Sequence, residues 1–385
     1  MRTRLASARK RKSSRFRDVS GRRAPAAQRA RTGVSILGGR SLGNWSPTTG
    51  PSTEGGPPTA AYVIKPTGRR RSLAVRSATA LLAGPPVIAV ILAGGGWLLL
   101  GLAVFIAAGL REFYGLARRT GAVVVAPTGY ALAAILLFLS PGARLLADGL
   151  GGIENAGPVR AWVIGILEAG ANRWEIAVTL TIVAPLVSLL FKRQASRDRL
   201  TGWTVTVVGA WYVTWLLGRV GSLRLLESPD DRYAGGAGWV MLMVLGTWAC
   251  DTGAYLVGSR FGRRKMVPWI SPGKTWEGAL GGAIATVVVV AASTAGMPEA
   301  ALGLEGLRWR PLPIPWEHVV PLGVGIAIAA MLGDLAESMI KRDAGAKDAS
   351  GLFPGHGGVL DRVDSVLFTA PFTYYYASLL LGQVA

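Results

Sequence analysis

The chain has 385 residues, half of them hydrophobic, and a formal net charge of +20. Its mean hydropathy is positive, and it carries several uncharged apolar runs of about 20 residues, the length that spans a bilayer. This composition excludes a soluble globular enzyme. The single cysteine, Cys250, excludes an intrachain disulfide.

Residues 1–76 form a strongly basic segment. They hold eighteen Lys and Arg against two acids, Asp18 and Glu54. The segment has no periodic apolar face, so we expect a disordered basic cytoplasmic tail that rests on anionic membrane lipids. Its few aromatic residues argue against a role in binding nucleic acid. Residues 77–385 are then expected to form one membrane-embedded domain.

The remaining chain predicts an all-α, polytopic helical membrane protein with about nine transmembrane helices. The expected spans are residues 78–93, 95–110, 121–140, 174–191, 201–219, 237–257, 276–296, 317–337 and 363–383. The first two share Gly94–Gly96, so they form either a tight hairpin or one broken helix.

The charges in the connecting loops predict the orientation. The four loops on the side of the N-terminus (111–120, 192–200, 258–275 and 338–362) hold sixteen Lys and Arg. The three loops on the other side (141–173, 220–236 and 297–316) hold seven. Because cationic loops stay in the cytoplasm, we expect an integral protein of a bacterial-type cell membrane with a cytoplasmic N-terminus. The charged stretch near the C-terminus then also faces the cytoplasm.

That stretch, residues 334–365, lies between two membrane-length segments. It contains five Asp, one Glu, two Lys, two Arg and one His. Asp334, Ser338 and Lys341 are spaced i, i+4, i+7 and therefore share one helix face. Asp361 and Asp364 open the next helix. Carboxylates and lysines brought together by a Gly-rich turn predict a site for a divalent metal and a polyphosphate at the membrane surface.

Two upstream segments add polar residues. Asp251 interrupts an apolar run about two turns before its end, so we expect it to have a buried cationic or metal partner. In SPGKTWEG, Ser271 and the following proline have the composition of a tight turn, and Lys274 projects at the start of the next helix. The free backbone N–H groups of residues 275–278 would suit an anion.

These motifs resemble a known family. SMIKRDAGAKDASGLFPGHGGVLDRVDS, from Ser338 to Ser365, matches the signature of phosphatidate cytidylyltransferases (CDP-diglyceride synthases) at every fixed polar position. The similarity continues in WACDTGAYLVG (248–258) and SPGKTWEGALGG (271–282), and more loosely in REFYGLARRTG (111–121). It covers roughly residues 78–384.

The resemblance implies transfer of CMP from CTP to phosphatidic acid, giving CDP-diacylglycerol and pyrophosphate, with Mg²⁺ as cofactor. It also implies that Asp334 and Asp361 bind the metal, and that Asp251 is functional. Asp364 either joins the metal ligands, pairs with Arg362 or caps its helix. Lys341, on the Asp334 face, is the first choice for contacting phosphate.

The remaining candidates are polar residues placed for substrate binding. They are Ser271, Lys274, Ser338, Arg342, Lys347, His356 and Arg362. For the cations the alternative is a role as positive-inside anchors, and for His356 it is ordering of its loop. Glu337 lies one step off the Asp334 face and would support the ligands.

Two other functions remain open on sequence. A CTP-dependent lipid kinase would use the γ-phosphorus of CTP and release CDP. An ion-coupled transporter would use Asp251 and Asp334 as an ion path, although the chain lacks repeated halves with paired broken helices. A homodimer is compatible with the sequence, which does not indicate an oligomeric state.

Overall fold

The computed structural model describes residues 84–150, 157–168, 172–191, 199–227, 234–295, 310–352 and 357–383. The chain divides into two units, residues 1–64 and 65–385, and every described residue belongs to the second. The predicted basic tail and its boundary at residue 76 therefore lie outside the described residues.

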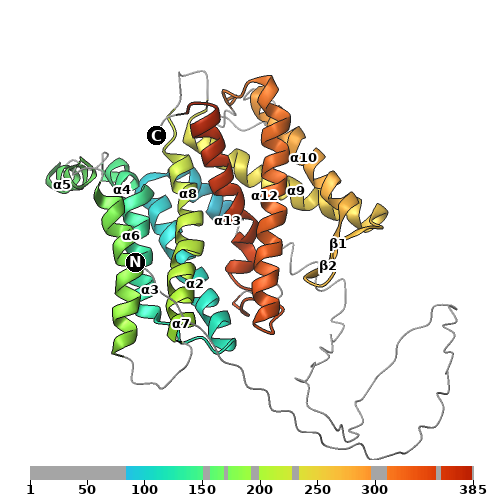
Figure 1. Cartoon of the computed structure of the whole chain (residues 1–385). Coiled ribbons are helices and arrows are strands. Elements are labelled where there is room, and N and C mark those ends of the chain that lie inside the picture. Colours follow the sequence, from blue (N-terminus) through green and yellow to red (C-terminus); the bar gives the residue numbers. More distant parts are fainter. Residues whose placement is uncertain are drawn as a thin grey trace, which may run out of the picture. The chain divides into compact units, whose positions relative to one another are not determined.

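The first half of the described chain is built from helices (Figure 1). They are a helix Gly84–Ala93, α2 (Gly95–Arg119), α3 (Ala126–Leu137), the π-helix η1 (Phe138–Gly142), α4 (Ala143–Leu150), α5 (Gly157–Glu168) and α6 (Asn172–Leu190).

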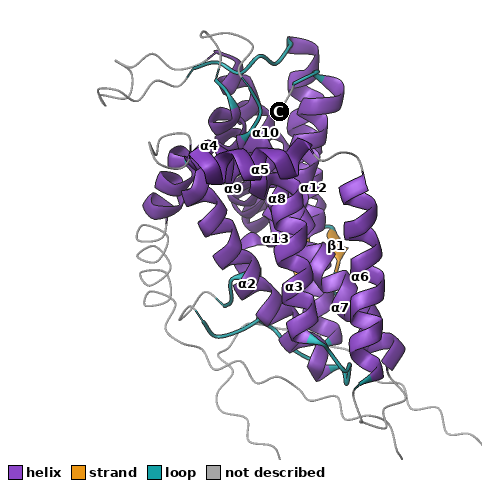
Figure 2. Cartoon of the chain, turned by 90° about the vertical axis from the view of Figure 1, so that its left-hand side faces the viewer, coloured by secondary structure: helices purple, strands orange, loops and turns teal. Residues whose placement is uncertain are grey.

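The second half adds longer helices and one short hairpin. They are α7 (Arg199–Gly209), the π-helix η2 (Ala210–Trp215), α8 (Leu216–Arg224), α9 (Gly236–Phe261), β1 (Lys265–Val267), β2 (Ser271–Thr275), α10 (Trp276–Ala295), α12 (Trp316–Asp343), α13 (Leu360–Tyr375) and the π-helix η3 (Tyr376–Leu380). β1 and β2 pair antiparallel, and Figure 2 shows how small this hairpin is beside the helices.

Six helical stretches of the described chain are long and apolar enough to cross a membrane. They are Gly95–Arg119, Ala126–Leu150, Arg199–Arg224, Gly236–Phe261, Trp276–Ala295 and Trp316–Asp343. Two shorter apolar helices, Gly84–Ala93 and Ala177–Leu190, accompany them. The prediction of an all-α membrane protein is confirmed, whereas the count of nine spans is not.

Several boundaries differ from the expected ones. The predicted outer loop 141–173 contains two helices, α4 and α5. Two other helices run beyond their apolar segments, α2 to Arg119 and α12 to Asp343. Apolar length marks what the bilayer covers, but the backbone hydrogen-bond ladder continues until a cap or a glycine stops it. The N-terminal pair forms two helices separated only by Gly94, which has a positive φ of 64°.

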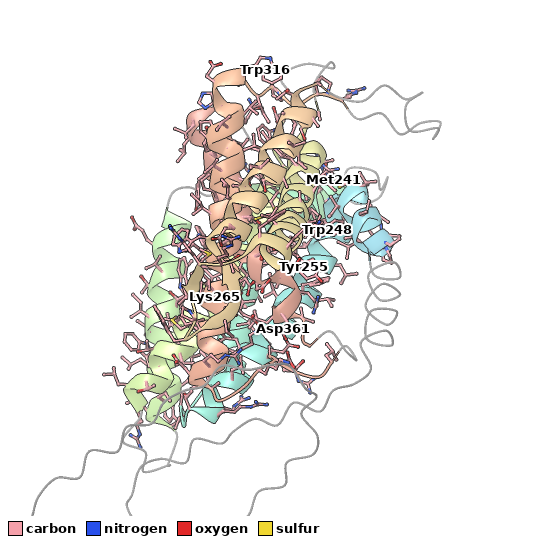
Figure 3. The ribbon with its side chains drawn as sticks, turned by 90° about the vertical axis from the view of Figure 1, so that its right-hand side faces the viewer. Met241, Trp248, Tyr255, Lys265, Trp316 and Asp361 are labelled. Carbon is pink, nitrogen blue, oxygen red and sulfur yellow. The ribbon has the colours of Figure 1, made fainter. Side chains whose placement is uncertain are left out.

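The charged end of the molecule is set by the crossing of α12 and α13. A Cβ at Gly333 would overlap the carbonyl oxygen of Asp364, so only glycine lets the two backbones approach this closely. Figure 3 shows Trp316, at the start of α12, and Asp361, at the start of α13, toward opposite ends of the helices. The end of α12 and the start of α13 therefore meet, and they carry most of the predicted site.

α9 and α10 form a second close pair, with the hairpin β1–β2 between them in sequence. Gly253 of α9 and Gly281 of α10 face each other, since a Cβ on Gly253 would lie 2.6 Å from the carbonyl oxygen of Gly281. Thr286 of α10 also donates to the Gly246 carbonyl of α9 at 3.2 Å. This packing holds the hairpin at one end of both helices.

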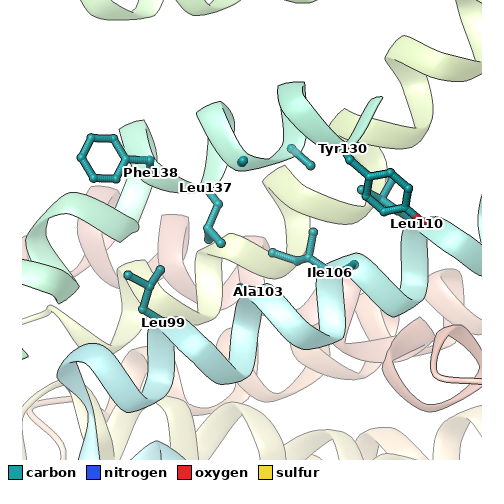
Figure 4. A pocket seen from close by; sticks show the side chains of 10 residues that line it. Leu99, Ala103, Ile106, Leu110, Tyr130, Leu137 and Phe138 are labelled. Carbon is teal, nitrogen blue, oxygen red and sulfur yellow. The ribbon is translucent and has the colours of Figure 1, made fainter. Parts of the chain in front are cut away.

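An apolar groove of about 270 Å³ lies between α2 and the α3–η1 segment (Figure 4). Its lining residues are Leu99, Ala103, Ile106, Ala107, Leu110, Tyr130, Ala133, Ala134, Leu137 and Phe138. None of the predicted site residues is among them. The groove offers no charge for a phosphate, so the chemistry has to be sought at the charged end.

One buried cation lies away from that end. Arg219 of α8 is 6% exposed, donates to the hydroxyl of Ser140 and has its guanidinium 4.1 Å from the ring centroid of Trp215. It therefore ties α8 to η1 through hydrogen bonding and a cation–π contact. Neither of these partners, Ser140 and Trp215, is a predicted site residue.

Candidate active site

A buried ion cluster joins α12 to α13. The Lys341 ammonium lies 2.6 Å from Oδ1 of Asp361 and also pairs with Oε2 of Glu337, one turn earlier on α12. Lys341 is 8% exposed and Glu337 is fully buried. Because a buried charge is costly unless it is paired, these three side chains depend on one another. We call Lys341, Glu337 and Asp361 the buried ion cluster.

Asp361 also organises the loop that precedes α13. Its Oδ2 accepts hydrogen bonds from the backbone N–H of Ala349 at 2.9 Å and of Gly358 at 2.7 Å. An ionised carboxylate offers about four lone-pair positions, and with Lys341 three of these are used. One position therefore remains for a further ligand.

Glu112 of α2 completes the start of α13. Its carboxylate accepts the N–H of Val359 at 2.9 Å and of Leu360 at 2.7 Å, and the hydroxyl of Ser350 at 2.6 Å. These are the N–H groups that an isolated helix would leave unsatisfied. Gly358 permits the approach, because a Cβ there would overlap the Glu112 carboxylate.

A second group of charges is more open. The Lys274 ammonium, from β2, lies 2.8 Å from Oδ2 of Asp334 and donates to the Met331 carbonyl at 3.1 Å. The hydroxyl of Ser338 donates to Oδ1 of Asp334 at 3.2 Å, as the shared helix face predicted. The Asp334 side chain is 36% exposed, against 8% for Asp361.

Asp251 belongs to this open group. Its side chain is exposed, and it is close enough to Asp334 and Lys274 to interact with both charges. The cation near Asp251 is thus Lys274, whose side chain is 20% exposed and therefore only partly buried. We call Lys274, Asp334 and Asp251 the open ion cluster.

Asp364 lies between the two clusters. Its Oδ1 accepts the N–H of Ser365 at 2.7 Å, and its charge interacts with those of Asp334 and Asp251. The crossing at Gly333 brings Asp364 next to Asp334. Three carboxylates therefore repel one another across this space, which a cation would relieve.

These carboxylates fit a magnesium ion that is only partly held by protein. Among the residues that the structure describes, no group of three or more His, Cys, Asp or Glu side chains has the arrangement of a metal site. Mg²⁺ is usually bound through one or two carboxylates together with waters and substrate phosphates. Asp334 and Asp364, with the remaining lone pair of Asp361, offer such a partial set.

The other predicted site residues do not belong to either ion cluster. Ser271 lies in β2, and Lys347 is exposed in the loop after α12. Arg342 donates to the Ala346 carbonyl at 3.0 Å and to the Ile270 carbonyl at 3.4 Å, so it fastens the hairpin to α12. Arg362 is exposed beside Asp361. His356 lies outside the described residues.

The structure corrects one expectation for the SPGKT segment and narrows another. Ser271–Thr275 is a strand paired with β1, not a tight turn, because the ladder satisfies its backbone. The free N–H groups expected at the start of α10 are partly used: the Thr275 hydroxyl accepts the N–H of Gly278 at 3.2 Å, and the Arg264 carbonyl accepts that of Trp276 at 2.9 Å. An anion would have to displace these bonds.

Sequence reasoning missed Glu112 as a site residue. It lies in REFYGLARRTG, an acid within a helix that is otherwise apolar up to Leu110, and such an acid signals a buried partner. Its partners are backbone N–H groups more than 230 residues away, which no local pattern reveals.

The fold and site define a polytopic helical membrane protein with carboxylates and lysines gathered at one end of its helices. Comparison with known proteins gives the family. The model of the cytidylyltransferase family matches residues 74–380, so the chain belongs to this family.

Three individual relatives agree with this family assignment. The phosphatidate cytidylyltransferase of Haemophilus influenzae is 34% identical over 203 residues, which is 53% of this chain and 65% of that protein. The enzyme of that name from Synechocystis is 47% identical over 135 residues, 35% of this chain and 41% of the relative. That from Bacillus subtilis is 31% identical over 210 residues, 54% of this chain and 70% of the relative. The first two matches thus span less than two thirds of the relatives' length.

Proposed function

We propose that this protein transfers CMP from CTP to phosphatidic acid, giving CDP-diacylglycerol and pyrophosphate. The proposal rests on family membership and on the names of the curated relatives. The structural observation that supports it is the pair of lysines, Lys274 and Lys341, each fixed on an aspartate at the same end of the helices.

Both lysines have bonding capacity left for a phosphate. An ammonium group has three N–H donors. Lys341 uses two of them on Glu337 and Asp361, and Lys274 uses two on Asp334 and the Met331 carbonyl. The third donor of each, oriented by the other two, would bind a phosphate oxygen of CTP or of the lipid.

The reaction needs positioning more than proton transfer. The phosphate of phosphatidic acid is ionised at neutral pH, so its oxygen attacks the α-phosphorus without a general base. One P–O bond forms to the lipid phosphate, and the bond to the β-phosphate breaks as pyrophosphate leaves with the electron pair. Lys274 and Lys341 would hold the two anions in line and offset the charge that develops.

Mg²⁺, held by Asp334, Asp364 and Asp361, would supply further positive charge at the phosphates when bound. Ser338 would keep Asp334 oriented through its hydrogen bond. Asp251 would extend the acidic surface on the α9 side. We place the site at the cytoplasmic leaflet on the loop-charge bias, so that CTP arrives from the cytosol and the lipid from the bilayer.

The test is product analysis with purified full-length protein in detergent. CTP labelled at the α-phosphate, supplied with phosphatidic acid and Mg²⁺, should place its label in the lipid fraction with one pyrophosphate per lipid. CTP labelled at the γ-phosphate should leave the lipid unlabelled. Label from the γ-position with release of CDP would show a lipid kinase and overturn the proposal.

A further inference from the structure

The phenol of Tyr212 is a buried hydroxyl without a hydrogen-bond partner in the described part of the chain. Tyr212 lies on η2, where the α-helical ladder is interrupted by a π-helix. Its ring packs against Phe113 of α2, with centroids 5.7 Å apart. π-helical bulges are rare and frequently occur at functional sites.

Tyr212 lies within electrostatic range of the buried ion cluster. Glu337 and Asp364 are the carboxylates whose charges act on Tyr212. Both Glu337 oxygens are buried; Oε2 is paired with Lys341, whereas Oε1 has no partner among the described residues. The Tyr212 hydroxyl and Oε1 of Glu337 are thus a buried donor and a buried acceptor without described partners, and the charge of Glu337 acts on the phenol. Leaving both unsatisfied is costly, whereas a direct bond or one trapped water would satisfy both.

We propose that Tyr212 is a positioning residue of the active site, whose hydroxyl donates a hydrogen bond to Glu337, directly or through one water. Glu337 in turn fixes the Lys341 ammonium against Asp361. The chain of contacts from Tyr212 to Glu337 to Lys341 would thereby set the direction of the third Lys341 donor toward the phosphate. This inference rests on the proposed function for its catalytic consequence, but the Tyr212–Glu337 pairing does not.

Tyr114 provides a matched control. Its hydroxyl is also buried but donates to the Thr206 carbonyl at 2.9 Å, a partner that is not among the site residues. Tyr212→Phe and Tyr114→Phe each remove one buried hydroxyl and keep the ring. We expect both to lower the melting temperature slightly and only Tyr212→Phe to lower turnover.

The experiment is a double-mutant cycle in full-length protein with Tyr212→Phe, Glu337→Gln and the combination. Tyr212→Phe should lower kcat about tenfold, as the loss of a residue that orients a site group typically does, with KM for CTP within about twofold. In the Glu337→Gln background the same change should have little further effect, because its target is already altered. The proposal would be overturned if the effects of the two substitutions on kcat simply multiplied in the double variant, or if Tyr212→Phe kept full activity.

Melting temperatures of the same four proteins keep the two proposals separate. A non-additive change in melting temperature would support the Tyr212–Glu337 bond even if the wild type formed no lipid-linked CMP, in which case only the proposed function would fail. Additive changes in melting temperature, with the wild type active, would refute the bond and leave the proposed function standing.

Discussion

The buried and open ion clusters use the same residue types under different conditions. In the buried cluster, the Lys341 side chain is 10% exposed and holds two carboxylates. In the open cluster, Lys274 is 20% exposed and its aspartate partner, Asp334, is 36% exposed. Both clusters lie where α12 approaches other elements of the charged end. They differ in how far water reaches their charges.

The difference in exposure between the two clusters predicts different effects on stability and on catalysis. Breaking a buried ion pair leaves an uncompensated charge in a low dielectric, whereas an exposed pair contributes little to stability because water screens it. Removing a charge from the buried cluster should therefore affect folding and activity together. Removing one from the open cluster should affect activity alone.

The largest effect is expected from Lys341→Met. It leaves Glu337 and Asp361 facing each other without a cation, which should cost about 3–5 kcal/mol of stability and abolish turnover. Unfolding followed by tryptophan fluorescence, together with the CMP-transfer assay, measures both. Lys347→Met, which removes an exposed lysine of the same stretch, is the control and should change little.

A second substitution sharpens this result. Lys341→Met combined with Glu337→Gln should regain part of the stability, since one uncompensated charge is gone, but none of the activity. Recovery of turnover in the double variant would mean that Lys341 serves only to neutralise Glu337.

Asp334→Asn is expected to have the next largest effect, and on activity alone. Losing the carboxylate that we propose binds the metal should lower kcat/KM at least 100-fold, about 2.7 kcal/mol, while the partly exposed position keeps the melting temperature within a few degrees. The control is Asp343→Asn, an exposed acid at the end of the same helix. An Asp334→Asn protein that kept more than about a tenth of the activity would not have lost a metal ligand.

Lys274→Met should show a smaller loss of the same kind. We expect turnover to fall about tenfold, about 1.4 kcal/mol, and stability to change by less than about 1 kcal/mol, as for an exposed pair. The comparison between the clusters would fail if Lys274→Met destabilised the protein as strongly as Lys341→Met.

The smallest effect is expected from deleting residues 1–70. All residues of both clusters lie at or after position 251, so activity in neutral detergent should remain within about twofold of the wild type, on the expectation that a disordered tail adds no packed surface. On anionic liposomes at low salt the truncated protein should bind its membrane substrate more weakly, and salt should erase the difference. A well-inserted but inactive truncation would show that the tail contributes to the site.

Sequence reasoning found the membrane class and most of the charged end, because apolar length and intramembrane charge are local signals. The i, i+4, i+7 spacing of Asp334, Ser338 and Lys341 survives in α12, and the first two form a hydrogen bond. The partner of Lys274 could not be read locally, since Asp334 lies 60 residues further along the chain.

The features that sequence reasoning missed or predicted wrongly depend on tertiary packing. The strand character of Ser271–Thr275 arises from pairing with β1, which overrides its turn-like composition. Glu112 comes from α2, in the first half of the described chain, and reaches the site only because α2 packs against α13. No spacing in the sequence encodes that contact.

The central claim is that Asp334 of the open ion cluster helps to hold the metal–nucleotide complex, and it can be tested without turnover. Mn²⁺, as a paramagnetic substitute for Mg²⁺, can be titrated by electron paramagnetic resonance into wild type, Asp334→Asn and Asp343→Asn in the presence of CTP. The account predicts that Asp334→Asn weakens protein-bound Mn²⁺ about tenfold or more, as loss of a ligand does, while Asp343→Asn matches the wild type. Equal Mn²⁺ affinity in all three proteins would contradict it.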